Sequence, residues 1–430
     1  MTHKLVDFFK IKQLRQIGIQ SYWVKPSYSQ LPSLYWPELD ILRGIAAILM
    51  IVNHLGHKTL NAEHLSYGLM NYIVFIGSFA PVLFFFVTGV GYGLQAHKGQ
   101  KSNHWSILLN KVVILILADS FFYWSNGRWL GLDFFGFIAI SCVVLELIRS
   151  SRRSISYSMT GLVLILALRY GIGPYLTLNK SLGHVGAFLS WFLGTSSHEG
   201  ISYPFSPWML YPLLGYILGW ISGREPNLIK QGWLRISCYL SLLAVIPLSS
   251  GIILAQRGSP FFRWGTVSFS YCVVSFSVIL IALACSILIN QLDRPRYLKK
   301  YLSLPGVSSF AIVPIHYFLI YLLETINLKN LSSPSFSIVF SITLILSFLI
   351  AQFVNKLGRY SERIDHQQSL YWGLVTIVIF SSAVVLVLHQ QSQWFAMVAR
   401  TFGQITLCLL FAIRRKKTEF DLTSNTNNPA

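Results

Sequence analysis

An arginine and a histidine lie eleven residues apart in the apolar stretch ELDILRGIAAILMIVNHLGHKTLNAEH. Eleven steps of about 100° end within about 20° of the starting direction, so Arg43 and His54 share one helix face, about 16 Å apart. An imidazole can act as a general base or a nucleophile, and a guanidinium can hold a phosphate or a carbonyl oxygen. The alternative is that Arg43 extends to the membrane surface and His54 is a buried histidine with satisfied hydrogen bonds.

A long cofactor with a phosphate head would fit this spacing. Its head would stay near Arg43 while its reactive end reached His54, and acyl-coenzyme A has that shape. Asp119 and His316 lie about 21 Å and about 20 Å into two other apolar stretches, and Asp133 lies near the outer end of another. Ionisable side chains inside hydrocarbon are costly and usually face the bundle interior, so we expect several of these groups to converge.

The composition indicates the class of protein. Hydrophobic residues make up 53% of the 430 residues, charged residues only 11%, and the mean hydropathy is +0.55. An ordinary soluble chain has about 25% charged residues, so this one lacks the polar residues to cover a surface in water. We predict an all-α polytopic transmembrane helical bundle with about 10–12 spans, each of about 20 apolar residues. The candidate spans are residues 39–56, 70–95, 105–124, 129–148, 155–171, 204–222, 233–254, 266–290, 303–324, 334–355, 370–389 and 394–413.

The distribution of basic residues predicts the orientation. The formal net charge is +19, from 34 Lys and Arg against 15 Asp and Glu. With the N-terminus inside, about 24 basic residues fall in inner segments and about 7 in outer loops, as the positive-inside rule requires. We therefore expect a multi-pass protein of the plasma (bacterial inner) membrane with both termini in the cytoplasm. The basic residues face anionic lipid rather than nucleic acid, and their inner rim could attract an anionic cofactor.

Several other classes of site lack support. The five cysteines lie inside apolar runs without metal-ligand spacing, and we predict no metal site. The sequence has no Walker motif, GxGxxG helix start, GxSxG or HExxH. No internal repeat favours an inverted-repeat transporter. The segment 172–203 is either a cap over a site or a plain outer loop.

The stretch LDILRGIAAILMIVNH resembles the signature helix of membrane acyltransferases of the acyltransferase-3 type and of the related heparan-alpha-glucosaminide N-acetyltransferase group. Arg43 and His54 match the Arg and His of that motif. Three looser matches are FAPVLFFFVTGVGYGL, FSPWMLYPLLGYILGW and LPGVSSFAIVPIHYFLIYL. The resemblance divides the chain into a cytoplasmic amphipathic segment (1–36), an acyltransferase-like core (37–325), additional helices (326–413) and a polar cytoplasmic tail (414–430).

The resemblance implies transfer of an acyl group, expected to be acetyl, from cytoplasmic acyl-CoA to a hydroxyl or amine. The acceptor would be a glycan, a lipid-linked sugar or a similar envelope molecule. His54 would be the general base or would carry the acyl group transiently, and Arg43 would hold a coenzyme phosphate or carbonyl. Asp119 or Asp133 would orient an imidazole, and His316 would bind the acceptor.

Two departures from the family pattern bear on the site. Many acyltransferase-3 members have an Arg-x-x-Arg element after the second helix, where this chain has AHKGQKSNHWSILLNK. We therefore predict Lys98 and Lys111 as cofactor-binding residues beside Arg43. In the lysosomal branch the acting His lies later, and His57 and His64 remain alternatives to His54.

Two rival functions fit the same buried groups. A transporter or flippase of a polar or lipid-linked solute could use the buried His and Arg residues as a proton relay. A family member without catalysis could act as a scaffold.

Overall fold

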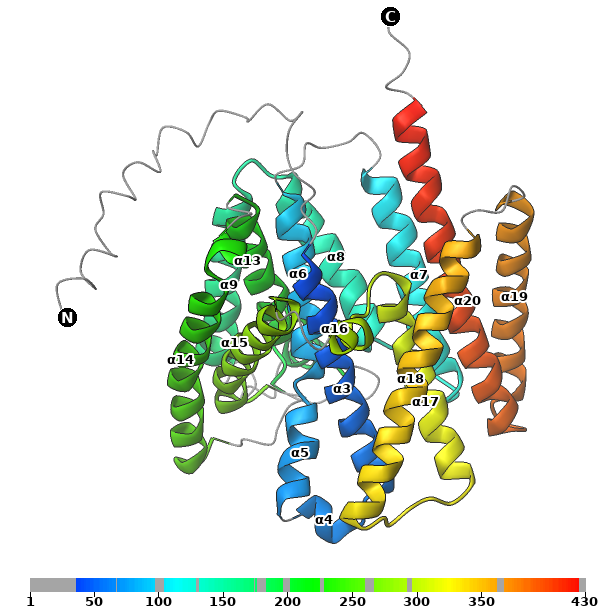
Figure 1. Ribbon diagram of the computed structural model, residues 1–430, viewed down its shortest axis with the longest axis horizontal. Coiled ribbons are helices and arrows are strands. Elements are labelled where there is room, and N and C mark those ends of the chain that lie inside the picture. Colours follow the sequence, from blue (N-terminus) through cyan, green and yellow to red (C-terminus); the bar gives the residue numbers. More distant parts are fainter. Residues whose placement is uncertain are drawn as a thin grey trace, which may run out of the picture. The chain divides into compact units, whose positions relative to one another are not determined.

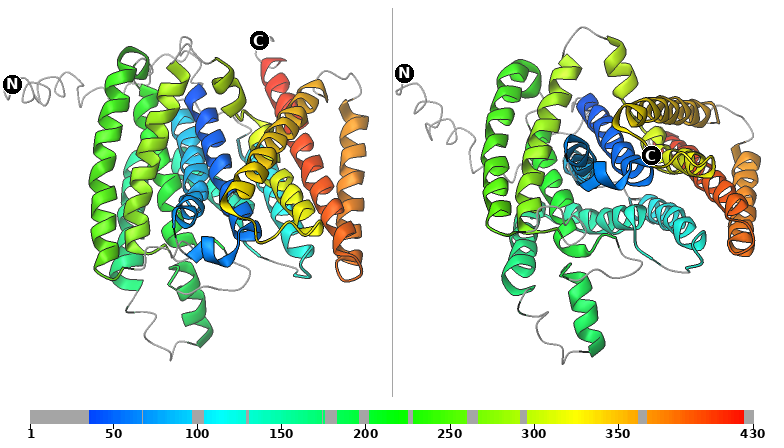
Figure 2. Two further views of the ribbon diagram at one scale, coloured as in Figure 1. Left: turned by 60° about the horizontal axis from the view of Figure 1, so that its bottom comes forward. Right: turned by 90° about the horizontal axis from the view of Figure 1, so that it is seen from below.

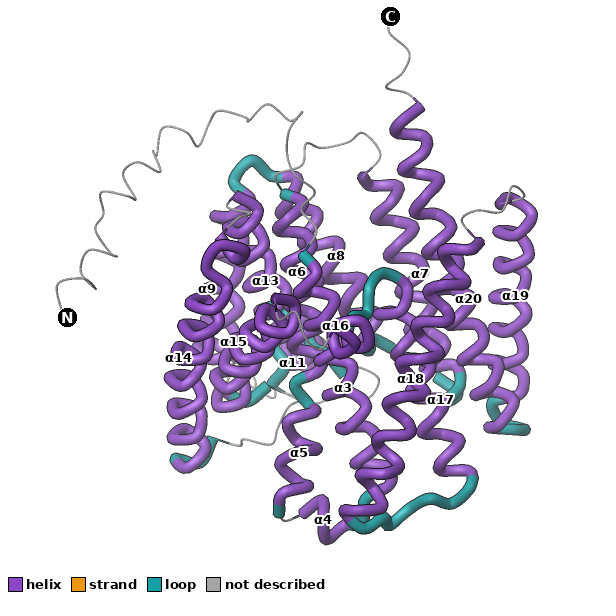
Figure 3. The backbone as a smooth tube through the Cα atoms, in the orientation of Figure 1, coloured by secondary structure: helices purple, strands orange, loops and turns teal. Residues whose placement is uncertain are grey.

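The computed structural model describes residues 36–66, 68–96, 104–128, 131–173, 175, 183–195, 202–224, 228–259, 267–291, 296–361 and 367–424. Almost all of this described chain is helical (Figure 3). The β pairing found in these ranges is one isolated bridge between Leu60 and Leu331. Apart from Trp36, the predicted segment 1–36 lies outside the described residues, as do Lys98 and much of the segment 172–203.

Long apolar helices make up the bundle, because a backbone in hydrocarbon must satisfy its polar groups within the segment. The first half of the described chain contains α3 (Pro37–Thr59), α4 (Ala62–Ser66), α5 (Leu69–Gly77), α6 (Ala80–Gln95), α7 (His104–Trp124), α8 (Phe134–Ser150), α9 (Ser154–Leu166), η3 (Ala167–Ile172), α11 (Gly183–Phe192) and α12 (Phe205–Trp208). The second half contains α13 (Leu210–Arg224), α14 (Leu228–Gln256), α15 (Phe269–Gln291), α16 (Arg296–Leu302), α17 (Val307–Thr325), α18 (Ser333–Ser361), α19 (Gln367–Leu388) and α20 (Gln393–Ser424).

Ten helices of the described chain are long and apolar enough to cross a bilayer, which confirms the predicted fold class. The two other predicted spans correspond to α8 and α13, which have 17 and 15 residues. At 1.5 Å per residue these helices are about 26 Å and about 22 Å long, shorter than a hydrocarbon core of about 30 Å. The predicted tail 414–430 begins inside α20, which continues as a helix to Ser424.

Helix α3 lies at the centre of the bundle and carries the candidate site. It contacts α5 and α6, which follow it in the chain, and α15, α17 and α18, which come from the second half (Figure 1). On opposite sides of it, α14 and α19 lie at the periphery (Figure 2). Peripheral helices expose large apolar side chains such as Leu242 and Phe380, as expected of surfaces that face lipid. Groups on α3 are therefore shielded from lipid by surrounding helices.

Glycines allow α6 and α13 to approach each other closely. A Cβ added at Gly89 of α6 would lie 1.9 Å from the carbonyl oxygen of Pro212, and one at Gly215 of α13 would lie 2.1 Å from that of Phe86. Small residues at helix interfaces allow this backbone contact in membranes. The glycine-rich stretch after Pro81 thus serves helix packing here.

One face of helix α20 is buried in the interior of the bundle. It contacts α7, α17 and α18, and α19 packs against it on another side. Gln404 of α20 is fully buried, and its amide donates a 2.7 Å hydrogen bond to the carbonyl oxygen of Ala118 on α7. This bond links α20 to α7, the helix that leads to the candidate site.

Candidate active site

The imidazoles of His54 and His316 meet where α3 crosses α17. Nδ1 of His54 lies 2.9 Å from Nε2 of His316, and the ring centroids are 5.2 Å apart in a stacked arrangement. His316 is fully buried. The structure thus brings together two of the predicted catalytic residues that the chain separates by 262 positions.

A backbone carbonyl assigns the protons on both rings. Nδ1 of His316 lies 2.9 Å from the carbonyl oxygen of Ile312. A carbonyl oxygen can only accept, so this Nδ1 carries the hydrogen, and Nε2 of the neutral ring accepts. Nδ1 of His54 must then donate to His316. The remaining nitrogen, Nε2 of His54, is unprotonated and keeps its lone pair, which is the requirement for a general base.

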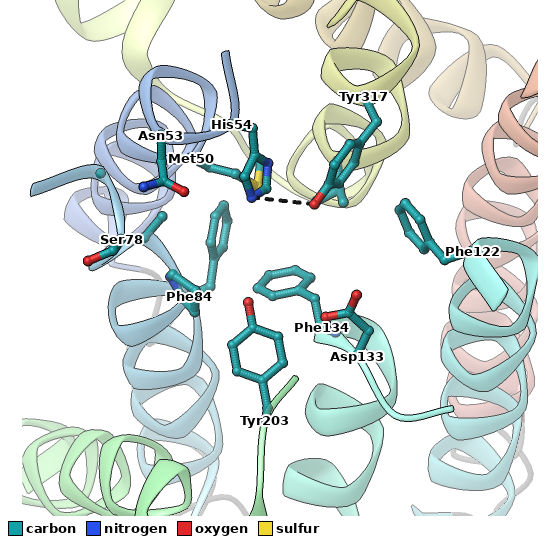
Figure 4. A pocket seen from close by; sticks show the side chains of 14 residues that line it. Met50, Asn53, His54, Ser78, Phe84, Phe122, Asp133, Phe134, Tyr203 and Tyr317 are labelled. Carbon is teal, nitrogen blue, oxygen red and sulfur yellow. Dashed lines mark hydrogen bonds between the residues drawn. The ribbon is translucent and has the colours of Figure 1, made fainter. Parts of the chain in front are cut away.

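Tyr317 lies against both imidazoles. Its ring stacks on His54 with centroids 4.7 Å apart and lies 4.4 Å from the centroid of His316. Its hydroxyl is 3.4 Å from Nε2 of His54, a long hydrogen bond in which the hydroxyl donates (Figure 4). A substrate hydroxyl or amine could therefore replace Tyr317 at this nitrogen at low cost.

A small cavity of about 40 Å³ opens beside His54. Figure 4 shows the Tyr203 hydroxyl and the Asp133 carboxylate pointing toward the same space as the imidazole. Burial, followed by the nearby Asp133 carboxylate, raises the pKa of Tyr203 well above its usual value, so its hydroxyl remains a neutral donor. The cavity is lined by Met50, Asn53, His54, Gly77, Ser78, Ala80, Pro81, Phe84, Phe122, Asp133, Phe134, Tyr203, Val313 and Tyr317.

The two predicted acidic residues have different positions. Asp133 precedes α8, where its carboxylate accepts from the Phe134 N–H at 2.9 Å and also lines the cavity. Asp119 lies behind it: its two oxygens accept from the N–H groups of Asp133 at 2.8 Å and Phe135 at 3.1 Å. Asp119 thus holds the turn that presents Asp133, and among the described residues its hydrogen bonds reach backbone rather than an imidazole.

Two of the predicted cofactor-binding residues, Arg43 and Lys111, lie apart from this cavity. Arg43 is at the opposite end of α3, where it forms an ion pair with Asp40 and keeps 27% of its side chain exposed. The α3 side chains that line the cavity begin at Met50. Lys111 of α7 lies over the ring of Tyr92, 5.1 Å from its centroid. Lys98 falls outside the described residues.

Sequence reasoning did not single out the aromatic part of the site. Tyr317 directly follows His316 in the chain, and Tyr203 directly precedes a predicted span, but an aromatic residue there is also typical of membrane interfaces. Of the three candidate histidines, only His54 lines the cavity, whereas His57 is exposed and His64 lies on α4.

Residues 36–246 match a family model described as heparan-alpha-glucosaminide N-acetyltransferase, catalytic. No curated protein matches the chain. The matched region includes His54, Asp119 and Asp133, whereas His316 and Tyr317 lie beyond its end. The match therefore covers one half of the histidine pair, and the tertiary structure supplies the other half.

Proposed function

Because the chain belongs to the heparan-alpha-glucosaminide N-acetyltransferase-like acyltransferase superfamily, we propose that it moves an acetyl group from acetyl-CoA to a hydroxyl or amine. The acceptor is a glycan or a lipid-linked sugar presented at the membrane. The enzyme is a multi-pass membrane protein, for which we propose the plasma membrane and cytoplasmic termini, as the distribution of basic residues favours.

The observation that supports this most strongly is the lone pair of His54 Nε2 at the cavity. The acceptor group loses its proton to this nitrogen while its oxygen or nitrogen attacks the thioester carbonyl carbon. The tetrahedral intermediate collapses with cleavage of the carbon–sulfur bond. The proton then passes from His54 to the sulfur of the leaving coenzyme, which gives free CoA thiol and the acylated acceptor.

His316 orients His54 in this mechanism. Both of its ring nitrogens have partners, the Ile312 carbonyl oxygen and Nδ1 of His54. We propose this role in place of acceptor binding, because a partner at each nitrogen leaves His316 no free lone pair or N–H. When His54 takes a proton, its Nδ1–H···Nε2 bond to His316 becomes charge-assisted and stronger, which stabilises the imidazolium.

The hydroxyls at the cavity would stabilise the oxyanion. Tyr317 reaches His54 Nε2 at 3.4 Å, and Tyr203 lines the same cavity. A neutral phenol donates to a developing negative charge, and preorganised donors in a dry site are a large part of enzymatic rate enhancement. Asp133 would accept a hydrogen bond from the acceptor and so orient it, because its carboxylate also lines the cavity.

The donor would approach from the other end of α3. Arg43 lies about 16 Å from His54 along the helix axis, and its partly exposed side chain suits a coenzyme phosphate or carbonyl. We propose that Lys98 and Lys111 add positive charge for the same coenzyme. The cavity volume of about 40 Å³ favours acetyl over a long acyl chain, because a cavity that holds a single water has about 10–15 Å³ by the same measure.

The test is the fate of labelled acetyl-CoA on purified protein in nanodiscs. We expect release of CoA thiol that depends on an added acceptor, with glucosamine as the amine probe and a membrane glycolipid extract as the hydroxyl probe. His54→Ala should abolish release while the protein still inserts and elutes as folded protein. A label that stays on the wild-type protein would indicate an acyl-His54 intermediate. Solute flux in liposomes without CoA release would favour a transporter instead.

A further inference from the structure

Arg400 of α20 is buried directly behind the His54 site. Only 5% of its surface is exposed, in a helix that packs on both α7 and α17. Its guanidinium lies over the ring of Phe122, 4.7 Å from the centroid, and 6.0 Å from that of Tyr317. Both rings line the cavity at His54.

The guanidinium is held without a carboxylate. Its Nη1 donates to the Ser125 hydroxyl at 3.2 Å, and this hydroxyl donates in turn to the Phe122 carbonyl oxygen at 2.9 Å. Among the described residues, its buried Nε has no hydrogen-bond partner. In the part of the chain that the structure describes, no Asp or Glu forms an ion pair with Arg400. Within the described ranges the positive charge is therefore uncompensated by a neighbouring anion, and its field acts on the groups beside it.

A buried charge of this kind is costly to maintain in a membrane protein, and such residues commonly belong to functional sites. Stability of α20 has other sources: Trp394 stacks on Tyr321 of α17, and Gln404 bonds to the Ala118 carbonyl oxygen. The cation and the two rings form a continuous series of contacts that ends at His54. Tyr317 meets Phe122 edge to face with ring centroids 5.2 Å apart, and it stacks on His54 with centroids 4.7 Å apart.

We propose that Arg400 is a positioning residue for acyl transfer that acts through Tyr317. Its guanidinium holds the Tyr317 ring against His54 and strengthens the Tyr317 hydroxyl as a hydrogen-bond donor to the tetrahedral oxyanion. A cation over a phenol ring withdraws electron density and stabilises negative charge nearby. This inference rests on the proposed acetyl transfer. It assigns a role in the site to α20, which lies outside the family-matched region 36–246.

The test is a double-mutant cycle between Arg400 and Tyr317, measured as CoA release from acetyl-CoA at saturating acceptor probe. Arg400→Met should lower kcat by about 10- to 100-fold with little change in KM. This is less than the roughly 100- to 1000-fold loss expected for a direct oxyanion donor, because Arg400 acts through Tyr317. Arg400→Lys, which keeps the charge, should recover a large part of kcat. In a Tyr317→Phe background, Arg400→Met should cause no further loss, because the hydroxyl through which it acts is gone.

The matched control is Gln404→Met, one helical turn along the same face of α20. It removes the bond to the Ala118 carbonyl oxygen but should leave kcat unchanged. If Arg400→Met does not fold, Arg400→Gln, which keeps hydrogen-bonding capacity without the charge, takes its place. An unchanged kcat, an equal loss in Gln404→Met, or an additive loss in the Tyr317→Phe background would overturn this role for Arg400 alone. A wild-type protein without acetyl transfer would instead overturn the proposed function, and this inference with it.

Discussion

His54 on α3 and His316 on α17 share a hydrogen bond between ring nitrogens 2.9 Å apart, although 262 positions separate them. The Ile312 carbonyl oxygen determines the tautomer of His316, and His316 determines that of His54. The direction of this relay leaves the lone pair on the nitrogen that faces the cavity. A backbone carbonyl on one helix thereby sets the chemical state of a side chain on another.

The tautomer relay predicts unequal effects of two substitutions at His316. His316→Phe removes the acceptor for the N–H of His54, so kcat should fall by about 10- to 100-fold, less than the roughly 100- to 10,000-fold contribution of the general base itself. His316→Gln places an amide oxygen where it can accept the same hydrogen and should retain more activity. CoA release at saturating donor and acceptor gives kcat for both variants. Equal losses would show that the ring itself, rather than its acceptor nitrogen, is needed.

Substitutions of Asp119 and Asp133 should affect different properties: the first should lower the stability of the fold, and the second should weaken the kinetics with the acceptor. Asp119→Asn places an amide group against two backbone donors and should destabilise the fold by about 1–3 kcal/mol, the cost of a buried unsatisfied group. Asp133→Asn keeps a good helix cap, so thermal stability should be retained. Its loss of charge at the cavity should instead raise KM for the acceptor probe. Thermal unfolding in detergent and steady-state kinetics distinguish the two. An Asp119→Asn variant as stable as the wild type would contradict the role of Asp119 in holding the turn before α8.

Arg43 should affect the donor rather than the acceptor. Arg43→Gln removes the guanidinium that we expect to hold a coenzyme phosphate or carbonyl, so KM for acetyl-CoA should rise by about 10-fold or more, the equivalent of one charged hydrogen bond. KM for the acceptor probe should stay the same. Arg257→Gln, an exposed arginine at the end of α14, controls for the change in net charge. Equal coenzyme affinity in wild type and Arg43→Gln would remove this residue from the donor site.

Gly89 and Gly91 form a matched pair for the packing of α6 on α13. A Cβ at Gly89 would lie 1.9 Å from the Pro212 carbonyl oxygen, whereas none of the surrounding atoms lies within 4 Å of a Cβ at Gly91. Gly89→Ala should cost about 1–3 kcal/mol or more, as for overpacking. Gly91→Ala should be neutral or slightly stabilising. Melting temperatures compare the variants, and similar losses at both positions would argue against the close contact.

The sequence by itself determined the class of fold and one of the helices that form the site. Apolar runs long enough to cross a bilayer predicted the helices, because hydrocarbon permits few other backbone arrangements. Helix periodicity placed Arg43 and His54 on the same face of one helix, and the resemblance carried by that helix identified the family. Asp133 and His316 stood out because ionisable residues in hydrocarbon are rare.

Only the tertiary structure decided which of these groups meet. Periodicity says which face of a helix a residue occupies, but it does not say which helix packs on that face. The contact of His54 with His316 and the position of Arg400 behind Tyr317 join helices distant in the chain. The hydrogen bonds that Asp119 accepts join α7 to the turn that precedes α8. These pairings depend on how the side chains of separate helices interlock, which is a property of the assembled bundle.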